Sequence, residues 1–439
     1  MSNLKIITEK NDVFEPNASC ALSGVFLGAN SFSNSSLLIH ASSGCGFAMR
    51  YGLGQHWKSF LVCPVSSLCD ENIIFGSEKL LYKSLTDFLD IHDSEVVFVG
   101  TGCSASVIGE DYISVTKELS EKYKKPIVFI DSGGLTGDLV KGYNNFLESI
   151  VKHFHSNDMP IYQKQAIDIC GIIPMYDMFW RGNINELKRL FQKLDIKINS
   201  FFTGDIDLKA MKNIYNSQLL ISIDQNVGKK MMYFLKNKTN TPTKIFPYSP
   251  IGINNTKMFL EEICMLLNMD QEVYSKKIES EVAIARKTIS RGFDFSKVMF
   301  TSARYALIGD VAKVIPMIDF LSNEIGMKCV MIAFTHRVGQ KEIADLEGYL
   351  SKRSEDINNI AVLNGEDNLL IRKTLKEIAP NLVFGRSIDR VSEMKKTVHI
   401  TWHFPASDHF VLYDRPIMGF KGTTSIVDYI VNGFSKIWY

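Results

Sequence analysis

The most constraining feature of the sequence is the alternation of short β-branched or aromatic runs with longer stretches of helical spacing. In the first third, such runs lie at 36–40, 95–100 and 126–131, and residues 105–123 between the last two have helical spacing. Strands that alternate with helices in this way predict βαβ units, and therefore a parallel sheet with right-handed crossovers.

The same pattern occurs twice more along the chain. Further runs lie at 166–174, 197–202, 218–223 and 244–247, and then at 305–309, 328–334, 360–363, 382–385 and 397–401. Residues 153–162 and 278–297 are the predicted connectors. We therefore expect an α/β chain of three Rossmann-like domains with mostly parallel sheets, at 1–155, 156–295 and 296–439. The length of 439 residues agrees with about 150 residues per domain.

Charge and hydropathy exclude several classes of protein. The chain has 49 Lys+Arg against 48 Asp+Glu, a net charge of +1, so no basic field favours a nucleic acid. The N-terminal segment is polar and lacks the apolar stretch of a signal peptide. No run approaches the roughly 18 apolar residues of a membrane span. We expect a cytoplasmic protein without nucleic-acid or membrane partners.

Eight cysteines are too sparse in a chain of this length for a disulfide scaffold. Five of them are interpreted as small hydrophobic residues. Cys170 and Cys329 lie in strand patterns, and Cys264 lies in the helical run 257–267. Cys63 and Cys69 follow the first predicted helix at a spacing that fits no metal motif.

Cys20, Cys45 and Cys103 are different. Cys45 and Cys103 lie in Gly/Ser-rich loops directly after the first and second predicted strands, and Cys20 lies in a strand-free stretch that could cross the same sheet end. Ligands of open α/β sheets bind outside the carboxyl ends of strands. Three converging thiolates would be a ligand set, but a four-iron cluster usually takes four protein ligands, so a second chain would have to complete it. From spacing alone, a structural role for all three is equally open.

At these cysteines the sequence resembles the nitrogenase component 1 family. The stretches that carry the resemblance are Cys20-Ala-Leu-Ser-Gly-Val-Phe-Leu-Gly28, His40-Ala-Ser-Ser-Gly-Cys-Gly-Phe-Ala-Met-Arg-Tyr51 and Gly102-Cys-Ser-Ala-Ser-Val-Ile-Gly-Glu-Asp111. The segments at 70–76, 132–143, 383–387 and 413–422 also fit, so the resemblance covers nearly the whole chain.

The resemblance implies a redox role. In this family an ATP-hydrolysing iron protein delivers electrons to an Fe–S cluster between two related subunits, from which they reach a second site where the substrate is reduced. Cys20, Cys45 and Cys103 occupy the positions of the cluster ligands. The spacing, 25 residues from Cys20 to Cys45 and 58 from Cys45 to Cys103, resembles that of the β-type subunit. An α-type partner subunit in a heterotetramer is then expected.

Some positions depart from the family. In the α-type subunit a cysteine holds the cofactor; the corresponding position here falls near Asp224, where the sequence has no cysteine. The residues around His403 and His409 do not match those around the histidine that binds the cofactor in the α-type subunit. A serine that can bind the eight-iron P-cluster of dinitrogenase β subunits is replaced by Gly134, with Ser132 two residues away. The resemblance therefore allows either an eight-iron cluster or a [4Fe–4S] cluster.

Two further functions are compatible with the same family. One is a scaffold subunit on which a nitrogenase cofactor matures, and the presence of all three cysteines argues modestly against it. The other is a homodimeric tetrapyrrole reductase, in which one chain supplies both halves of the cluster site. The sequence identifies neither the substrate, nor a catalytic residue, nor the residues that contact the iron protein.

Overall fold

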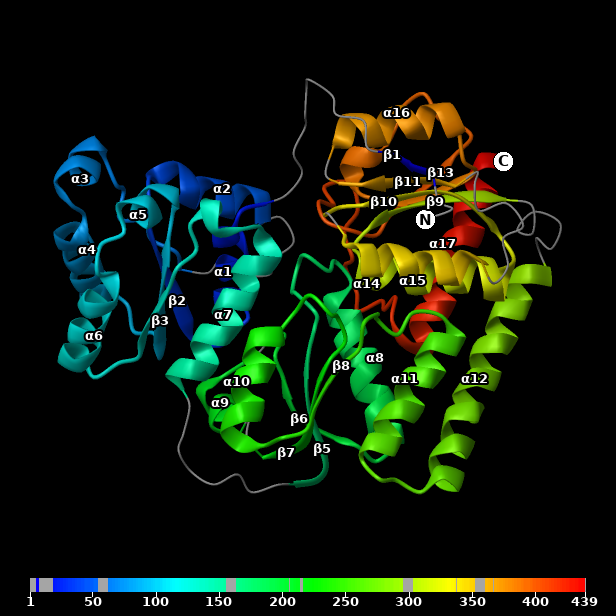
Figure 1. The fold of residues 1–439 in the computed structure, drawn as a ribbon, viewed down its shortest axis with the longest axis horizontal. Helices are drawn as coiled ribbons and strands as arrows, with labels where there is room; N and C mark the ends of the chain where they lie inside the picture. Colours follow the sequence, from blue (N-terminus) through cyan, green and yellow to red (C-terminus); the bar gives the residue numbers. More distant parts are fainter. Residues whose placement is uncertain are drawn as a thin grey trace. The chain divides into compact units, whose positions relative to one another are not determined.

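The computed structural model describes residues 5–7, 19–53, 62–154, 163–204, 206–213, 216–294, 303–336, 338–351, 360–365 and 367–438. Within them the strands form three sheets whose registered pairs are parallel (Figure 1). The predicted α/β class with mostly parallel sheets is therefore confirmed.

The strands are β1 (Lys5–Ile7), β2 (Ser35–His40), β3 (Val96–Thr101), β4 (Ile127–Ile130), β5 (Gln163–Cys170), β6 (Lys197–Phe201), β7 (Ser217–Ser222), β8 (Thr243–Ile245), β9 (Arg304–Gly309), β10 (Lys328–Phe334), β11 (Ala361–Asn364), β12 (Leu382–Gly385) and β13 (Val398–Thr401). The sheet orders are β2-β3-β4, β6-β5-β7-β8 and β1-β11-β10-β9-β12-β13.

The α-helices are α1 (Ala21–Asn30), α2 (Ser43–Leu53), α3 (Asp70–Phe75), α4 (Glu78–Ile91), α5 (Cys103–Ile108), α6 (Tyr112–Tyr123), α7 (Leu139–His153), α8 (Trp180–Lys193), α9 (Leu208–Asn213), α10 (Lys229–Thr239), α11 (Ile253–Leu266), α12 (Gln271–Asp294), α14 (Val311–Ile318), α15 (Gln340–Ser351), α16 (Asn368–Ile378) and α17 (Gly419–Trp438). Short 3₁₀ or π turns are η2 (Gly134–Thr136), η3 (Asp319–Ile325) and η5 (Ser387–Asp389).

The chain divides into two compact units. Ser19–Met175 and Ile198–Ile245 form one unit, which contains the first two sheets; Tyr176–Lys197 and Phe246–Tyr439 form most of the other, which contains the third sheet. β1 also belongs to the third sheet, because Lys5–Ile7 pairs with β11. The three sheets agree with three Rossmann-like folding patterns, and the boundaries at 155/156 and 295/296 stay a prediction.

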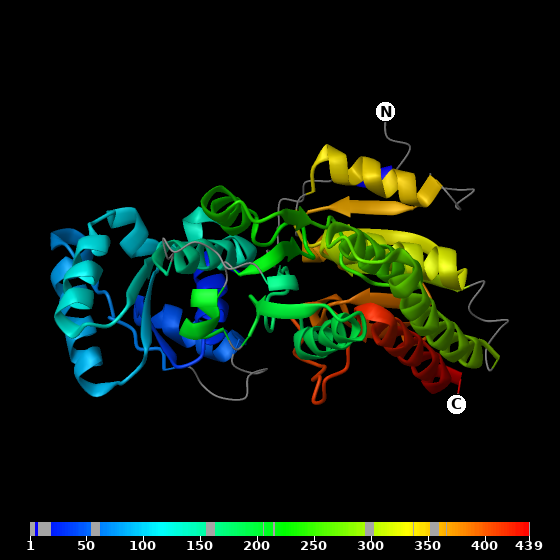
Figure 2. The same cartoon turned by 90° about the horizontal axis from the view of Figure 1, so that it is seen from below.

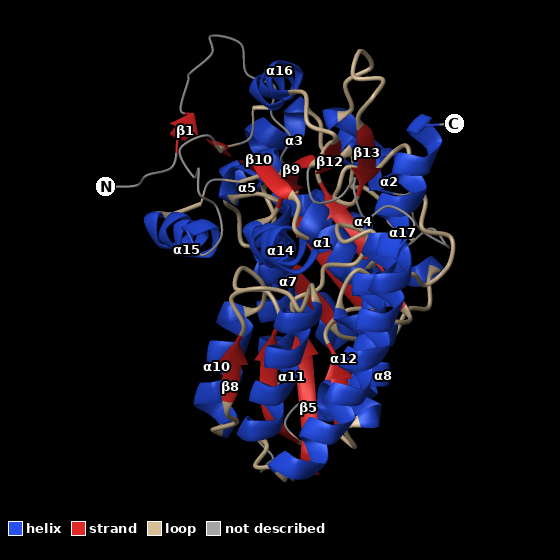
Figure 3. Cartoon of the chain, turned by 90° about the vertical axis from the view of Figure 1, so that its right-hand side faces the viewer, coloured by secondary structure: helices blue, strands red, loops and turns tan. Residues whose placement is uncertain are grey.

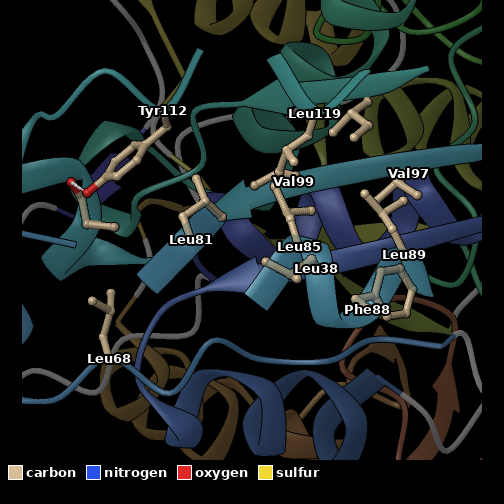
Figure 4. Packing of buried hydrophobic residues seen from close by; sticks show 12 residues of the cluster. Leu38, Leu68, Leu81, Leu85, Phe88, Leu89, Val97, Val99, Tyr112 and Leu119 are labelled. Atoms are coloured by element: carbon tan, nitrogen blue, oxygen red, sulfur yellow. Dashed lines mark hydrogen bonds between the residues drawn. The ribbon is translucent and has the colours of Figure 1, made fainter. Parts of the chain in front are cut away.

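The first sheet lies between two layers of helices. On one face, α4 and α6 pack on Leu38, Val97 and Val99 in a cluster of buried apolar side chains (Figure 4). On the other face lie α1, which contacts β2 and β3, and α7, which contacts β4. The residues Val62–Leu68 continue this sheet beside β2, with Ile39 N donating to Pro64 O and Leu68 N donating to Ala41 O. The pattern of apolar runs did not predict this outer segment.

The predicted helix over residues 105–123 is two helices. Gly109 has φ +70° and ends α5 in a left-handed conformation. Asp111 then caps α6, its carboxylate accepting a hydrogen bond from Ser114 N. The apolar spacing alone predicts one continuous helix. The positive φ of Gly109 ends the first helix, and the N-capping Asp111 begins the second.

The third sheet carries helices on both sides of its strands. α14 contacts β9 and β10, α16 contacts β10, and α17 lies along β13 (Figure 3). The predicted connector at 278–297 is part of α12 as far as Asp294, and α12 packs beside α17 (Figures 1 and 2). The other predicted connector, 153–162, lies almost entirely outside the described residues. No described helix is long and apolar enough to cross a membrane.

Candidate functional site

The three predicted ligands stand at the N-terminal ends of three helices of one unit. Cys20 is the N-cap of α1, Cys45 lies in the first turn of α2, and Cys103 is the first residue of α5. β2 and β3 are neighbouring parallel strands in register at His40 and Thr101, so Cys45 and Cys103 follow the same carboxyl edge of the sheet. The predicted placement of these two residues is confirmed.

Cys20 is brought to this edge by the loop after β4. Ala21 N donates to Gly137 O, Leu139 N donates to Ser19 O, and Cys20 forms an isolated antiparallel bridge with Asp138. These contacts place Cys20 against η2.

Two glycines lie between the three cysteines. A Cβ built on Gly134 would be 3.0 Å from Cys103 Sγ and 3.2 Å from Cys20 Cβ. A Cβ built on Gly102, which precedes Cys103, would be 3.6 Å from Cys45 Sγ. Gly134 therefore lies between Cys20 and Cys103, and Gly102 lies beside Cys45.

The environment of these thiols differs from that of the buried cysteines. Cys103 is exposed, and Cys20 and Cys45 are partly buried. By contrast, burial raises the pKa to about 12 for the thiols of Cys63, Cys170, Cys264 and Cys329. Cys63, Cys170 and Cys264 are buried, as the sequence predicts for them, and Cys329 is partly buried on β10.

The fifth cysteine that was interpreted as a packing residue is at the surface. Cys69 is exposed at the N-cap of α3, where its side chain takes part in a capping box with Asn72. Its role as a small buried hydrophobe is therefore wrong. The prediction fails because the buried segment beside β2 ends at Leu68, so Cys69, the next residue, lies outside it.

The chemistry of the three cysteines can be compared with that of known metal sites. Among the residues that the structure describes, no three His, Cys, Asp or Glu side chains lie close enough together to hold one metal ion. Thiolates that ligate different irons of one cluster stand farther apart, and the space left by the absent side chain of Gly134 lies between Cys20 and Cys103. Soft thiolate ligands are the donors of Fe–S clusters. The thiols of Cys20, Cys45 and Cys103 thus have the chemistry of Fe–S cluster ligands.

Exposed apolar side chains flank the cysteines. They belong to the helices α2, α3 and α5 and to η2: Phe47, Tyr51, Ile73, Ile74, Phe75, Val107 and Leu135. Phe75 is 83% exposed and Leu135 is 78% exposed. Apolar groups this exposed, next to a set of metal ligands, are typical of a surface that a partner protein covers.

A buried polar network holds the loops at this edge, and sequence reasoning gave it no role. His40 Nδ1 is 2.9 Å from Ser66 Oγ, and His40 Nε2 is 3.1 Å from Ser77 Oγ. Glu110 Oε2 accepts hydrogen bonds from Ser77 N and Ser77 Oγ, both at 2.7 Å. The network ties the segment before α4 to the loop after α5, and burial lowers the pKa of His40 to about 4. The sequence signals were the polar residue at the end of an apolar strand and the place of His40 and Glu110 in the stretches that resemble the family.

The remaining candidate positions lie in other surroundings. Ser132 is buried and its hydroxyl donates to Thr101 O at 2.9 Å. Asp224 is buried at the end of β7, and its Oδ1 accepts from Asn226 N. His403 is buried in the other unit with Nε2 3.0 Å from Asp310 Oδ2, and His409 packs on Tyr429. Each has a structural contact that accounts for its place in the fold.

Comparison with known proteins identifies a family over nearly the whole chain. A family model described as nitrogenase component 1 type oxidoreductase matches residues 20–435. The nitrogenase molybdenum-iron protein beta chain of Methanococcus maripaludis is 25% identical over 100% of this chain and 98% of that protein. A light-independent protochlorophyllide reductase chain of Ephedra altissima is 23% identical over 94% of this chain and 82% of that protein.

A solved structure has the same fold. The structure described as nitrogenase Cp1 at pH 6.5 superimposes with a TM-score of 0.82 and 19% sequence identity, covering 98% of this chain and 95% of that one. The architecture derived from the strand pattern is therefore that of a known protein.

Proposed function

Because the chain belongs to the nitrogenase component 1 type oxidoreductase family, we propose that it is the β-type subunit of a nitrogenase-like reductase. In this role it receives electrons from an ATP-dependent iron protein and passes them to a reducible substrate or cofactor in an α-type partner. The observation that carries the proposal is the convergence of Cys20, Cys45 and Cys103 on Gly134 and Gly102 at one sheet edge.

The cysteines are proposed to act as thiolate ligands. An Fe–S cluster, when bound, supplies one-electron transfer. The N-terminal ends of α1, α2 and α5 stabilise the negative charge of the three thiolates. Three ligands leave the cluster incomplete, so the partner subunit is proposed to supply the rest.

Gly134 bears on the type of cluster. It lies next to Cys20 and Cys103 and supplies no side-chain ligand, and the hydroxyl of the nearby Ser132 donates to Thr101 O. The site therefore has no side-chain oxygen at this position with which an oxidised cluster could gain a ligand. This favours a [4Fe–4S] cluster over an eight-iron cluster.

The exposed apolar side chains at the site are proposed to be covered by the partner subunit and by the iron protein. Phe75 and Val107 come from the two segments that the Glu110–Ser77 hydrogen bonds hold together. Because these hydrogen bonds already hold the two segments in place, docking of an electron donor beside the cysteines does not require the free-energy cost of ordering a loop.

The test is anaerobic co-purification with the α-type partner. We expect iron, acid-labile sulfide and a brown chromophore in the complex, and all three are expected to be lost in Cys45→Ala and Cys103→Ala. Cys264→Ala, which changes a buried thiol in α11 of the other unit, is the matched control and should retain the chromophore. A colourless wild-type complex free of iron would refute the assignment.

A tetrapyrrole reductase is the second candidate, favoured by the absence of a side chain at Gly134 and by the similarity to a protochlorophyllide reductase chain. Native mass measurement separates a heterotetramer from a homodimer. Mössbauer spectra of the complex distinguish four-iron from eight-iron clusters. A complex that reduces no substrate but passes a metal cofactor to an acceptor protein would instead be an assembly scaffold.

A further inference from the structure

An aspartate without a role in the proposed function lies beside α5. Asp131 directly follows β4, and its carboxylate is exposed to solvent. Ser106 Oγ of α5 donates to Asp131 Oδ1 at 2.8 Å, and Thr101 Oγ1, at the end of β3, donates to the same oxygen at 3.2 Å. One carboxylate oxygen thus joins the ends of two strands to the helix that begins at Cys103.

The loop after β4 is fixed to the same two elements. Ser132 N donates to Thr101 Oγ1 at 3.1 Å, and Ser132 Oγ donates to Thr101 O at 2.9 Å. A Cβ built on Gly133 would be 2.3 Å from Ser106 Oγ, so the loop lies directly on α5. The hydrogen bonds of Asp131 therefore belong to a network that sets the position of this loop relative to both β3 and α5.

The position of this loop bears on two of the proposed cluster ligands. A Cβ built on Gly134, the next residue of the loop, would be 3.0 Å from Cys103 Sγ and 3.2 Å from Cys20 Cβ. Ser106 follows Cys103 by three residues, which is a rise of about 4.5 Å along the helix. The carboxylate of Asp131 is therefore bonded to α5 less than one turn after Cys103.

The negative charge of Asp131 has no counterion in the described part of the chain. Hydroxyl groups donate to its carboxylate, and no described Lys, Arg or His side chain pairs with it. Hydroxyl donors orient a carboxylate but leave its charge in place. Reduction adds negative charge to a redox centre, so an anion nearby disfavours the reduced form, to an extent that solvent and salt screen.

We propose that Asp131 is a positioning residue for Cys103 and that its charge lowers the reduction potential of the Fe–S cluster. The inference rests on the proposed function, because the second effect needs the cluster. The two effects depend on different properties of one side chain. Positioning needs an oxygen that accepts hydrogen bonds, and the effect on the potential needs a negative charge.

Asp131→Asn separates these two properties. The amide oxygen of asparagine accepts the hydrogen bonds from Ser106 and Thr101, but the side chain carries no charge. Asp131→Ala removes both the acceptor and the charge. Asp93→Asn is the matched control, because it removes the same charge at the opposite edge of the sheet. Asp93 precedes β3, and its exposed carboxylate is 3.1 Å from Lys125 Nζ.

The experiment is a redox titration of the anaerobically purified complex with the α-type partner, followed by electron paramagnetic resonance, together with iron analysis. We expect Asp131→Asn to keep the wild-type iron content. At a fixed electrode potential it should raise the ratio of reduced to oxidised cluster about threefold, which is a shift of about +28 mV in the midpoint potential of a one-electron couple. Asp131→Ala should raise the potential and also lower the iron content. Asp93→Asn should change neither.

Ionic strength tests the electrostatic part of the proposal. The Debye length is about 30 Å in 0.01 M salt and about 3 Å in 1 M salt. The difference in midpoint potential between the wild type and Asp131→Asn should therefore shrink as salt is added. A difference that came from a displaced loop would not follow the Debye length.

Four outcomes would overturn the proposal: an unchanged potential in Asp131→Asn at low salt, an equal shift in Asp93→Asn, a shift that salt does not reduce, or equal iron contents in Asp131→Asn and Asp131→Ala. In each of them the wild-type complex still holds iron and shows a redox couple. A wild-type complex without iron or a redox couple would refute the proposed function, and this inference with it.

Discussion

Gly24 of α1 and Gly142 of α7 lie against each other where the two helices cross. A Cβ on Gly24 would be 2.0 Å from Leu139 O, and a Cβ on Gly142 would be 1.8 Å from Ala21 O. The backbones of the two helices are therefore in direct contact at these glycines, and Ala21 directly follows Cys20. The crossing therefore positions one of the three proposed cluster ligands.

We predict that Gly142→Ala separates the two helices and displaces Cys20. Overpacking at backbone contact costs about 3 kcal/mol of unfolding free energy, and the iron content of the complex should fall with it. Gly348→Ala in α15 is the matched control, since a Cβ there meets nothing within 4 Å. It should stabilise by about 0.5–1 kcal/mol through helix propensity. Denaturant unfolding and iron analysis measure both effects, and equal stability of the two variants would contradict the close approach.

A second prediction concerns the space beside Cys103. Gly134→Ala places a methyl group 3.0 Å from Cys103 Sγ, so it should lower the iron and sulfide bound per complex while changing the unfolding free energy by less than about 1 kcal/mol. Gly44→Ala, next to Cys45 but with open space around its Cβ, should retain full iron. Full iron content in Gly134→Ala would show that the cluster does not occupy the space between Cys20 and Cys103.

The third prediction is a pH dependence from His40. Burial lowers the pKa of this fully buried imidazole from 6.5 to about 4. As pH falls, the unfolded chain therefore takes up a proton on His40 at a higher pH than the folded chain does. The contribution of neutral His40 to the free energy of unfolding is complete above about pH 6.5 and is lost as pH falls toward 4. The loss amounts to about 3 kcal/mol. In His40→Asn this part of the pH dependence should disappear. Urea unfolding at a series of pH values tests this, and parallel curves for the two proteins would contradict the assignment.

The fourth prediction is a pH dependence of stability from Asp168, with the opposite sign to that from His40. It is buried on β5, where Asn199 Nδ2 donates to it at 3.0 Å and Ser217 also donates, and burial raises its pKa from 3.8 to about 7. The folded state keeps the carboxyl proton of Asp168 up to a higher pH than the unfolded state does. The contribution of the protonated carboxyl to the free energy of unfolding is therefore complete below about pH 4 and is lost as pH rises through 7. We predict that Asp168→Asn stabilises the protein by up to about 4 kcal/mol at pH 8 and by much less at pH 5. An equal effect at both pH values would show that the carboxyl does not titrate in this range.

The amino-acid sequence alone was enough to predict the class of fold and the family. Short apolar runs between helical stretches predicted the parallel sheets, because strands buried on both faces must be apolar throughout. The motifs around Cys20, Cys45 and Cys103 identified the family that the comparisons confirm. The position of Cys45 and Cys103 after neighbouring strands followed from the same pattern, since parallel strands end at one edge.

Local conformation and tertiary packing set the remaining features. The break at Gly109 depends on a positive φ, which apolar spacing does not encode. The surface position of Cys69 depends on where the segment beside β2 ends. Cys20 follows no strand of the first sheet, and the crossing at Gly24 and Gly142, with the bridge to Asp138, brings it to Gly134. Contacts between residues this far apart in the chain are set by the packing of helices on a sheet, and no local pattern in the sequence specifies them.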